Sequence, residues 1–173
     1  MPPITKRADI SPLIARGRME PAAVFGELRR LAASPEWPAR EVAATALVDL
    51  ARRHPEAVLA EAMRWSAEDD ANVRRAASEG LRGVVKRQPT AVWPVLARLR
   101  ADPSSYVRTS VANVLRNASG PHPAAVLALC RRWLTEAGGD PLVRRTVTDG
   151  LRRLRATHPR EVSDVLASAP PAA

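Results

Sequence analysis

Apolar and polar residues alternate along this chain with the spacing of helices, and the pattern recurs in pairs. From residue 21 onward, a Pro-x-x-Val opening returns at intervals of 34, 34, 34 and then 36 residues. Each opening is followed by roughly 12 residues of helical periodicity and then by a polar break. A second helical stretch begins after each break, and its first core position is Ala39, Val73, Val107 and Val143 in successive repeats. Proline fits the first turn of a helix, where its missing N–H is not needed. The sequence therefore predicts first helices at Pro21, Pro55, Pro89, Pro123 and Pro159.

Paired helices at a fixed period predict an all-α fold, an α-solenoid in which each pair stacks on its neighbours. The aromatic pattern of tetratricopeptide repeats and the Thr-Pro-Leu-His of ankyrin repeats are absent. An acidic residue or proline followed by Val-Arg, as in Asp140-Pro-Leu-Val-Arg-Arg, resembles HEAT-type repeats. Glycine at residues 80 and 150, one position of two repeats, predicts close helix packing because glycine otherwise destabilises a helix. We expect the repeat domain over residues 21–168. Residues 1–20 are expected to be partly disordered or to hold a short capping helix, and residues 169–173 to be a disordered tail.

The distribution of charged residues along the chain adds information about binding partners. The 173 residues carry a net charge of +9, and 25 of the 27 basic residues are arginine. Residues 1–70 have a net charge of −1, whereas residues 71–173 have a net charge of +10. A basic surface without a partner is one explanation, and a polyanionic partner is the more economical one. The chain has no apolar run of about 18 residues, so no membrane partner is expected. A single cysteine, Cys130, is typical of a cytoplasmic protein and is expected to be buried.

The second helices carry the candidate chemistry. In residues 73–86, a helical projection places Val73, Ala76, Ala77, Gly80, Leu81 and Val84 on an apolar stripe, with Arg75, Ser78, Glu79, Arg82 and Lys86 opposite. Glu79 occupies the repeat position of Thr45, Asn113 and Asp149. This polar face has two interpretations: a solvated surface with weak ion pairs, or a row of arginines that binds phosphates. Trp65 would stack on a base or, alternatively, pack at a helix end.

Two motifs add a family resemblance. Trp65 with Asn72-Val-Arg-Arg-Ala-Ala-Ser-Glu-Gly-Leu-Arg82 resembles a segment of the AlkC-type DNA alkylation repair glycosylases. Val107-Arg-Thr-Ser-Val-Ala-Asn-Val-Leu115 resembles their Val-Arg-x-Ser-Val-Ala-Asn-His-Leu, and the match extends over about residues 55–157. Two positions depart from the family. Gly83-Val-Val-Lys-Arg87 stands where the family has Pro-Arg-Leu-Pro-Trp, and Arg116-Asn117 stands where it has Asn-Asp.

The resemblance implies a HEAT-like glycosylase, related to the AlkD type, that hydrolyses the N-glycosidic bond of cationic alkylated bases in double-stranded DNA. Such a base is already a good leaving group, so a carboxylate near the sugar suffices to stabilise the developing cation. By this resemblance Glu79 is the catalytic residue. The expected DNA contacts are Trp65, Arg74, Arg75, Arg82, Lys86, Arg87, Arg108, Asn113, Arg116, Asn117, Arg144 and Arg145.

The departures from the family favour an alternative, a non-catalytic HEAT-repeat adaptor that binds protein or nucleic acid through the same face. In either case the chain is expected to be monomeric. No metal and no cofactor is expected, because His54, His122 and His158 lack ligand spacing and no glycine-rich phosphate loop occurs.

Overall fold

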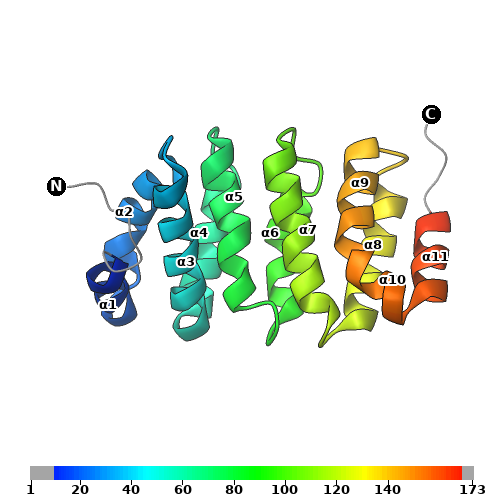
Figure 1. The fold of residues 1–173 in the computed structure, drawn as a ribbon, viewed down its shortest axis with the longest axis horizontal. Helices are drawn as coiled ribbons and strands as arrows, with labels where there is room; N and C mark the ends of the chain where they lie inside the picture. Colours follow the sequence, from blue (N-terminus) through cyan, green and yellow to red (C-terminus); the bar gives the residue numbers. More distant parts are fainter. Residues whose placement is uncertain (1–9, 169–173) are drawn as a thin grey trace. The chain divides into compact units, whose positions relative to one another are not determined.

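The computed structural model describes residues 10–168, and this part of the chain is helical throughout, without a strand (Figure 1). The elements are α1 (Ser11–Met19), α2 (Ala22–Ala32), α3 (Trp37–Arg53), α4 (Pro55–Trp65), α5 (Ala71–Gly80), η2 (Leu81–Gly83), α6 (Pro89–Leu99), α7 (Ser105–Ser119), α8 (Pro123–Glu136), α9 (Pro141–Gly150), η3 (Leu151–Arg153), α10 (Leu154–Thr157) and α11 (Pro159–Ala167). The predicted helical pairs are therefore confirmed, with α4, α6, α8 and α11 each beginning at a proline. No helix in residues 10–168 has the length and apolar character needed to span a bilayer.

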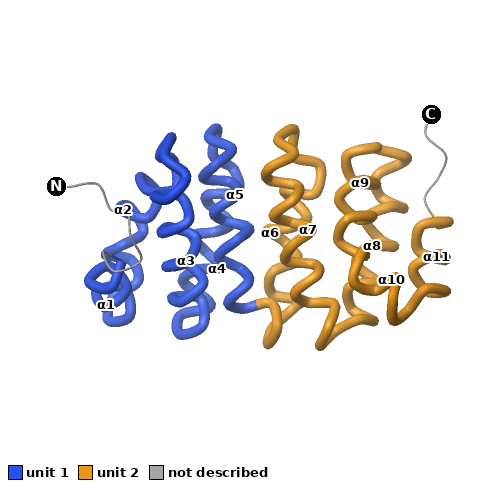
Figure 2. Tube along the Cα trace, viewed as in Figure 1, with its two compact units in different colours: residues 1–84 blue, residues 85–173 orange. Residues whose placement is uncertain are grey.

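The chain divides into two compact units, Met1–Val84 and Val85–Ala173 (Figure 2). In the first unit, α3 packs against α2, α4 and α5, and α1 packs on α2 and α3. The short helix α1 covers the residues around Leu13 where a capping helix was expected. In the second unit, α7 packs against α6, α8 and α9, and α11 packs against α8 and α10. Residues 1–9 and 169–173, for which disorder was predicted, lie outside the described part of the chain.

The core is built from the predicted apolar stripes. Val73, Ala76, Ala77, Leu81 and Val84 are all buried, as is the matching set on α7. Leucine, valine and alanine supply most of the buried side chains, as the composition predicts. Cys130 is fully enclosed, and burial raises the pKa of its thiol to about 12. A thiol with so high a pKa is almost entirely protonated at neutral pH, so Cys130 is a core residue and not a nucleophile.

Two glycines set how closely successive second helices pack. A Cβ added to Gly80 would lie 2.9 Å from the Cβ of Leu47 on α3. One added to Gly150 would lie 2.6 Å from Cδ1 of Leu115 on α7. At both glycines the α-helix ends and a 3₁₀ turn, η2 or η3, continues the chain. The predicted close approach is confirmed, and it explains why glycine is used in the interior of a helical stretch despite its cost.

Candidate nucleic-acid interface

Glu79 lies in the last turn of α5, two residues before η2 begins. The residue is only 3% exposed, and its Oε2 accepts a hydrogen bond from Nη1 of Arg82 at 2.8 Å. The neighbouring Ser78 is fully buried. Of the two interpretations of this polar face, a solvated surface does not describe Ser78 or Glu79, because packing encloses both side chains. A helical projection separates the two faces of one helix, but it does not show whether neighbouring helices bury the side chains of the polar face.

The two arginines beside Glu79 are engaged in ion pairs. Arg75 Nη2 donates to Oε1 of Glu41 on α3 at 2.7 Å, and its side chain is mostly buried. Arg82 pairs with Glu79 and is about half exposed. Glu41 and Arg75 occupy the same position of consecutive repeats, so the repeat register itself contained the signal for this pair. Around Glu79, each of these guanidinium groups is already matched by a carboxylate.

The arginine of the Val-Arg motif, which is Ala39-Arg40 in the first repeat, has a structural role in three repeats. Nη1 of Arg74 donates to the carbonyl oxygens of Glu68 at 2.9 Å and Asp69 at 2.7 Å, in the turn that precedes α5. Arg40 binds the equivalent carbonyls of Ser34 and Pro35, and Arg108 those of Asp102 and Pro103. These guanidinium groups hold the turn between the two helices of a pair. Arg74 and Arg108 were predicted to contact DNA, and the structure shows their Nη1 atoms bound to the protein backbone instead.

Arg144 is the exception among these arginines. The turn before α9 contains Gly138 and Gly139, both with positive φ, which account for the longer repeat interval. The N-cap of α9 is provided by Asp140, whose side chain accepts from the amide nitrogens of Leu142 and Val143. Nη1 of Arg144 makes a long contact of 3.5 Å to the carbonyl of Leu166, and the residue is exposed. Its guanidinium is therefore the most accessible of the Val-Arg set.

The tryptophans are mostly core residues. Trp65 is buried, and its Nε1 donates to Oε1 of Glu61 at 2.6 Å. Trp133, in the matching position of α8, is fully buried and lies 5.8 Å from the guanidinium carbon of Arg100. Of the two roles expected of Trp65, the enclosed indole fits packing at a helix end, and its contact with DNA stays a prediction. Trp37, at the start of α3, is 60% exposed.

The remaining predicted contacts lie in the second unit. Arg116 on α7 donates through Nη2 to Oδ1 of Asn113 and through Nη1 to the carbonyl oxygen of Asp149 on α9 at 2.8 Å. Asn117 donates from Nδ2 to the carbonyl of Asn113 at 2.8 Å, so its side-chain amide bonds to the backbone one turn earlier in its own helix. Lys86 and Arg87, just before α6, are exposed.

Sequence reasoning placed Asp149 and Arg152 on the polar face but did not include them among the DNA contacts, and the structure places them beside Arg145. Nε of Arg145 lies 2.9 Å from Oδ2 of Asp149, and Nη2 of Arg152 lies 3.5 Å from Oδ1. Their spacing of four and three residues puts the three side chains on one helical face. That spacing was the signal available in the sequence.

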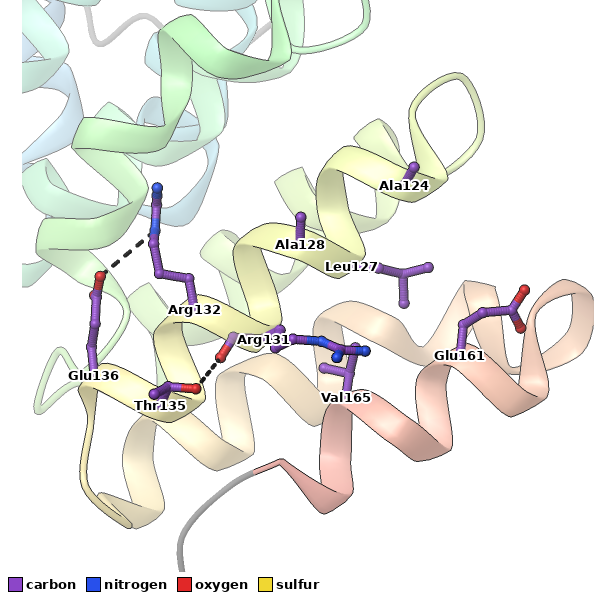
Figure 3. A pocket seen from close by; sticks show the side chains of 9 residues that line it. All are labelled: Ala124, Leu127, Ala128, Arg131, Arg132, Thr135, Glu136, Glu161 and Val165. Carbon is purple, nitrogen blue, oxygen red and sulfur yellow. Dashed lines mark hydrogen bonds and ion pairs between the residues drawn. The ribbon is translucent and has the colours of Figure 1, made fainter.

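A groove between α8 and α11 is a separate surface feature, of about 640 Å³ (Figure 3). Its apolar floor includes Leu127, Ala128 and Val165, and Arg131, Arg132, Glu136 and Glu161 line it as well. Arg132 pairs with Glu136 at 3.6 Å. Two arginines and two glutamates balance in charge, so this groove has no electrostatic preference for a polyanion.

The helical pairs, their Val-Arg turns and their close contacts define an α-solenoid of HEAT-like repeats. Two solved structures share this fold. AlkD2 from Streptococcus mutans has a TM-score of 0.68 and 23% identity, with 83% of this chain and 70% of that chain covered. The protein smu.31 from Streptococcus mutans UA159 has a TM-score of 0.67 and 24% identity, covering 83% and 73%. No protein-family model and no curated protein sequence matches the chain. The predicted resemblance to the AlkC/AlkD type is thus confirmed for the fold.

Proposed function

We propose that this protein is a DNA-binding HEAT-like repeat protein that acts in DNA alkylation repair. The observation that carries the proposal is the excess of positive charge in the second unit. Residues 85–173 hold 14 Lys and Arg against 6 Asp and Glu, a net charge of +8, while residues 1–84 have a net charge of +1. The fold shared with AlkD2 supports the assignment to alkylation repair.

The ion pairs differ between the two units in the same direction as the net charge. In the first unit, Glu27, Asp49, Glu68, Glu61, Glu41 and Glu79 each pair with a different arginine. In the second unit, Glu136 pairs with both Arg100 and Arg132, and Asp149 with both Arg145 and Arg152. Shared carboxylates leave an uncompensated positive potential, which attracts the phosphate backbone of duplex DNA without regard to sequence.

The salt dependence of DNA affinity tests the proposed DNA binding. Binding of the full chain to a fluorescently labelled duplex should weaken steeply as salt rises, because each neutralised phosphate releases counterions. The slope of log affinity against log salt gives the number of phosphates contacted. Absence of binding at low salt would rule out a DNA role and leave an adaptor for a protein partner.

The finer proposal is catalysis by Glu79, in which its carboxylate stabilises the cationic sugar as an alkylated base departs. In this role Glu79 would act through a carboxylate whose Oε2 accepts a hydrogen bond from Nη1 of Arg82 at 2.8 Å. Burial of Glu79 means that Arg82, which is half exposed, has to move aside before the carboxylate meets a sugar.

An assay of base release from alkylated duplex DNA tests catalysis directly. Glu79→Gln should abolish release while DNA binding persists, and Glu56→Gln is the matched control because Glu56 is exposed on α4 of the same unit. If the wild-type protein releases no base, or if Glu79→Gln releases it at the wild-type rate, Glu79 is not the catalytic group.

A second candidate function, a non-catalytic DNA-binding adaptor, is favoured by one observation. The pair formed by Glu79 and Arg82 recurs three residues apart at Asn113–Arg116 and again at Asp149–Arg152. A contact that recurs at one repeat position is typical of a structural element of the repeat. Strong DNA binding without release of any alkylated base would establish this function.

A further inference from the structure

The two units contain equivalent helix pairs whose polar positions can be compared one by one. In the first unit, α3 packs against α5, and in the second, α7 packs against α9. By repeat register, α3 contributes Glu41, Thr45 and Val48 where α7 contributes Thr109, Asn113 and Arg116. Likewise, α5 and the following η2 contribute Arg75, Glu79 and Arg82 where α9 and the following η3 contribute Arg145, Asp149 and Arg152. The two sets differ in charge although their backbones correspond.

The α3–α5 set is electrically balanced. Its two guanidinium groups, those of Arg75 and Arg82, pair with Glu41 at 2.7 Å and with Glu79 at 2.8 Å. Arg75 and Glu79 are largely enclosed. An incoming phosphate would have to displace a desolvated carboxylate here, which is costly because the displaced charge would be left unpaired.

The α7–α9 set has three guanidinium groups and one carboxylate, a local charge of +2. Threonine replaces the glutamate at residue 109, and Arg116 replaces an apolar valine. The side chains of Arg145 and Arg152 are 73% and 70% exposed, and that of Asp149 is 28% exposed. Arg116 lies beside them, bound to the carbonyl oxygen of Asp149. Exposed ion pairs of this kind are weak, so the carboxylate of Asp149 is readily exchanged for another anion.

We infer that the α7–α9 face is the main phosphate-contact surface, and that Asp149 is an internal counter-anion which DNA phosphates displace from Arg145 and Arg152. Until DNA binds, Asp149 holds the two guanidinium groups on one side of α9. A phosphate oxygen pair then takes its place, since arginine binds phosphate with a bidentate geometry. This inference rests on the proposed DNA binding, and it moves the centre of the interface from Glu79 to Asp149.

Asp149→Asn gives the inference a distinctive test, because removing an acid in the right place should tighten binding. With two exposed ion pairs released, the affinity for labelled duplex DNA at low salt should rise about three- to tenfold. The matched control is Asp164→Asn on α11, which makes the same charge change at an exposed residue of the same unit. Its effect on affinity should be markedly smaller, and circular dichroism melting curves show whether both variants fold as the wild type does.

Substitution of the arginines completes the experiment. Arg145→Gln and Arg152→Gln should each weaken binding and reduce the salt slope by about one, whereas Arg160→Gln on α11 should not. If wild-type protein binds DNA but Asp149→Asn and Asp164→Asn bind equally well, the inference is wrong while the proposed function stands. If wild-type protein does not bind duplex DNA at low salt, the proposed function and this inference are both overturned.

Discussion

Replacement of Arg108 by lysine separates a structural arginine from a DNA-binding one without changing the net charge. Nη1 of Arg108 donates to two backbone carbonyls, those of Asp102 and Pro103, and the latter lies at 3.0 Å. A lysine side chain ends a bond short of Nη1, so it cannot bridge both oxygens. Arg144 holds the same repeat position in the same unit, but its contact to Leu166 is 3.5 Å long. Arg144→Lys is therefore the matched control.

The structure sets the size of the expected effect. A hydrogen bond from a charged donor contributes about 1.5–3 kcal/mol when buried, and Arg108 is only partly buried. We expect Arg108→Lys to lower the free energy of unfolding by about 1–2 kcal/mol. A contact of 3.5 Å exceeds normal hydrogen-bond length, so Arg144→Lys should cost less than about 0.5 kcal/mol.

Urea denaturation followed by circular dichroism measures both changes. With a slope of about 1–3 kcal/mol per molar urea, the midpoint for Arg108→Lys should fall by roughly 0.5–1 M. DNA affinity of the folded protein should stay at the wild-type value, because the charge is retained and Arg108 serves the turn. Equal midpoints for the two variants, or a loss of DNA affinity in Arg108→Lys beyond that in Arg144→Lys, would refute the turn-holding role.

Further predictions concern packing, pH and thiol chemistry. Gly83→Ala should destabilise the first unit by about 1–3 kcal/mol, because the new Cβ would lie 2.8 Å from Cβ of Ala51. Gly26→Ala should stabilise α2 by about 0.5–1 kcal/mol, because the space around Gly26 is open. The urea midpoints of the two variants measure both changes. A hydrogen bond from Arg18 lowers the pKa of Asp49, so the stability that this pair contributes is present above the ordinary carboxyl pKa and is lost as pH falls through the lowered value. The stability difference between wild type and Asp49→Asn should therefore shrink on acidification, and a constant difference would exclude the ion pair as its cause. Cys130, with a pKa of about 12 and no exposed surface, should resist iodoacetamide in native protein and react only under denaturing conditions, as mass spectrometry would show.

The candidate site was only partly predictable. Repeat register aligned Glu79, Asn113 and Asp149 correctly, because equivalent helices place equivalent residues at the same height in each pair. It did not reveal that Glu79 is enclosed or that Arg74 and Arg108 bind the backbone of their own turns. Nor did the motif match single out Asp149, since a spacing of Arg, Asp and Arg on one helix is common in solvated helices.

The sequence by itself determined the helical pairs, the prolines near which the first helices begin and the buried faces. Proline at the first turn, apolar periodicity and polar breaks are local signals that involve residues close together in the sequence. They can therefore be recognised without knowledge of contacts between distant residues. The tertiary structure decided which charges are available to a ligand. Arg75 is neutralised by Glu41, which lies 34 residues earlier. In the second unit threonine, at residue 109, holds the repeat position of that glutamate, and Arg145 shares Asp149 with Arg152. Availability of a charge depends on partners from neighbouring helices and on desolvation, and both arise only when the helices pack.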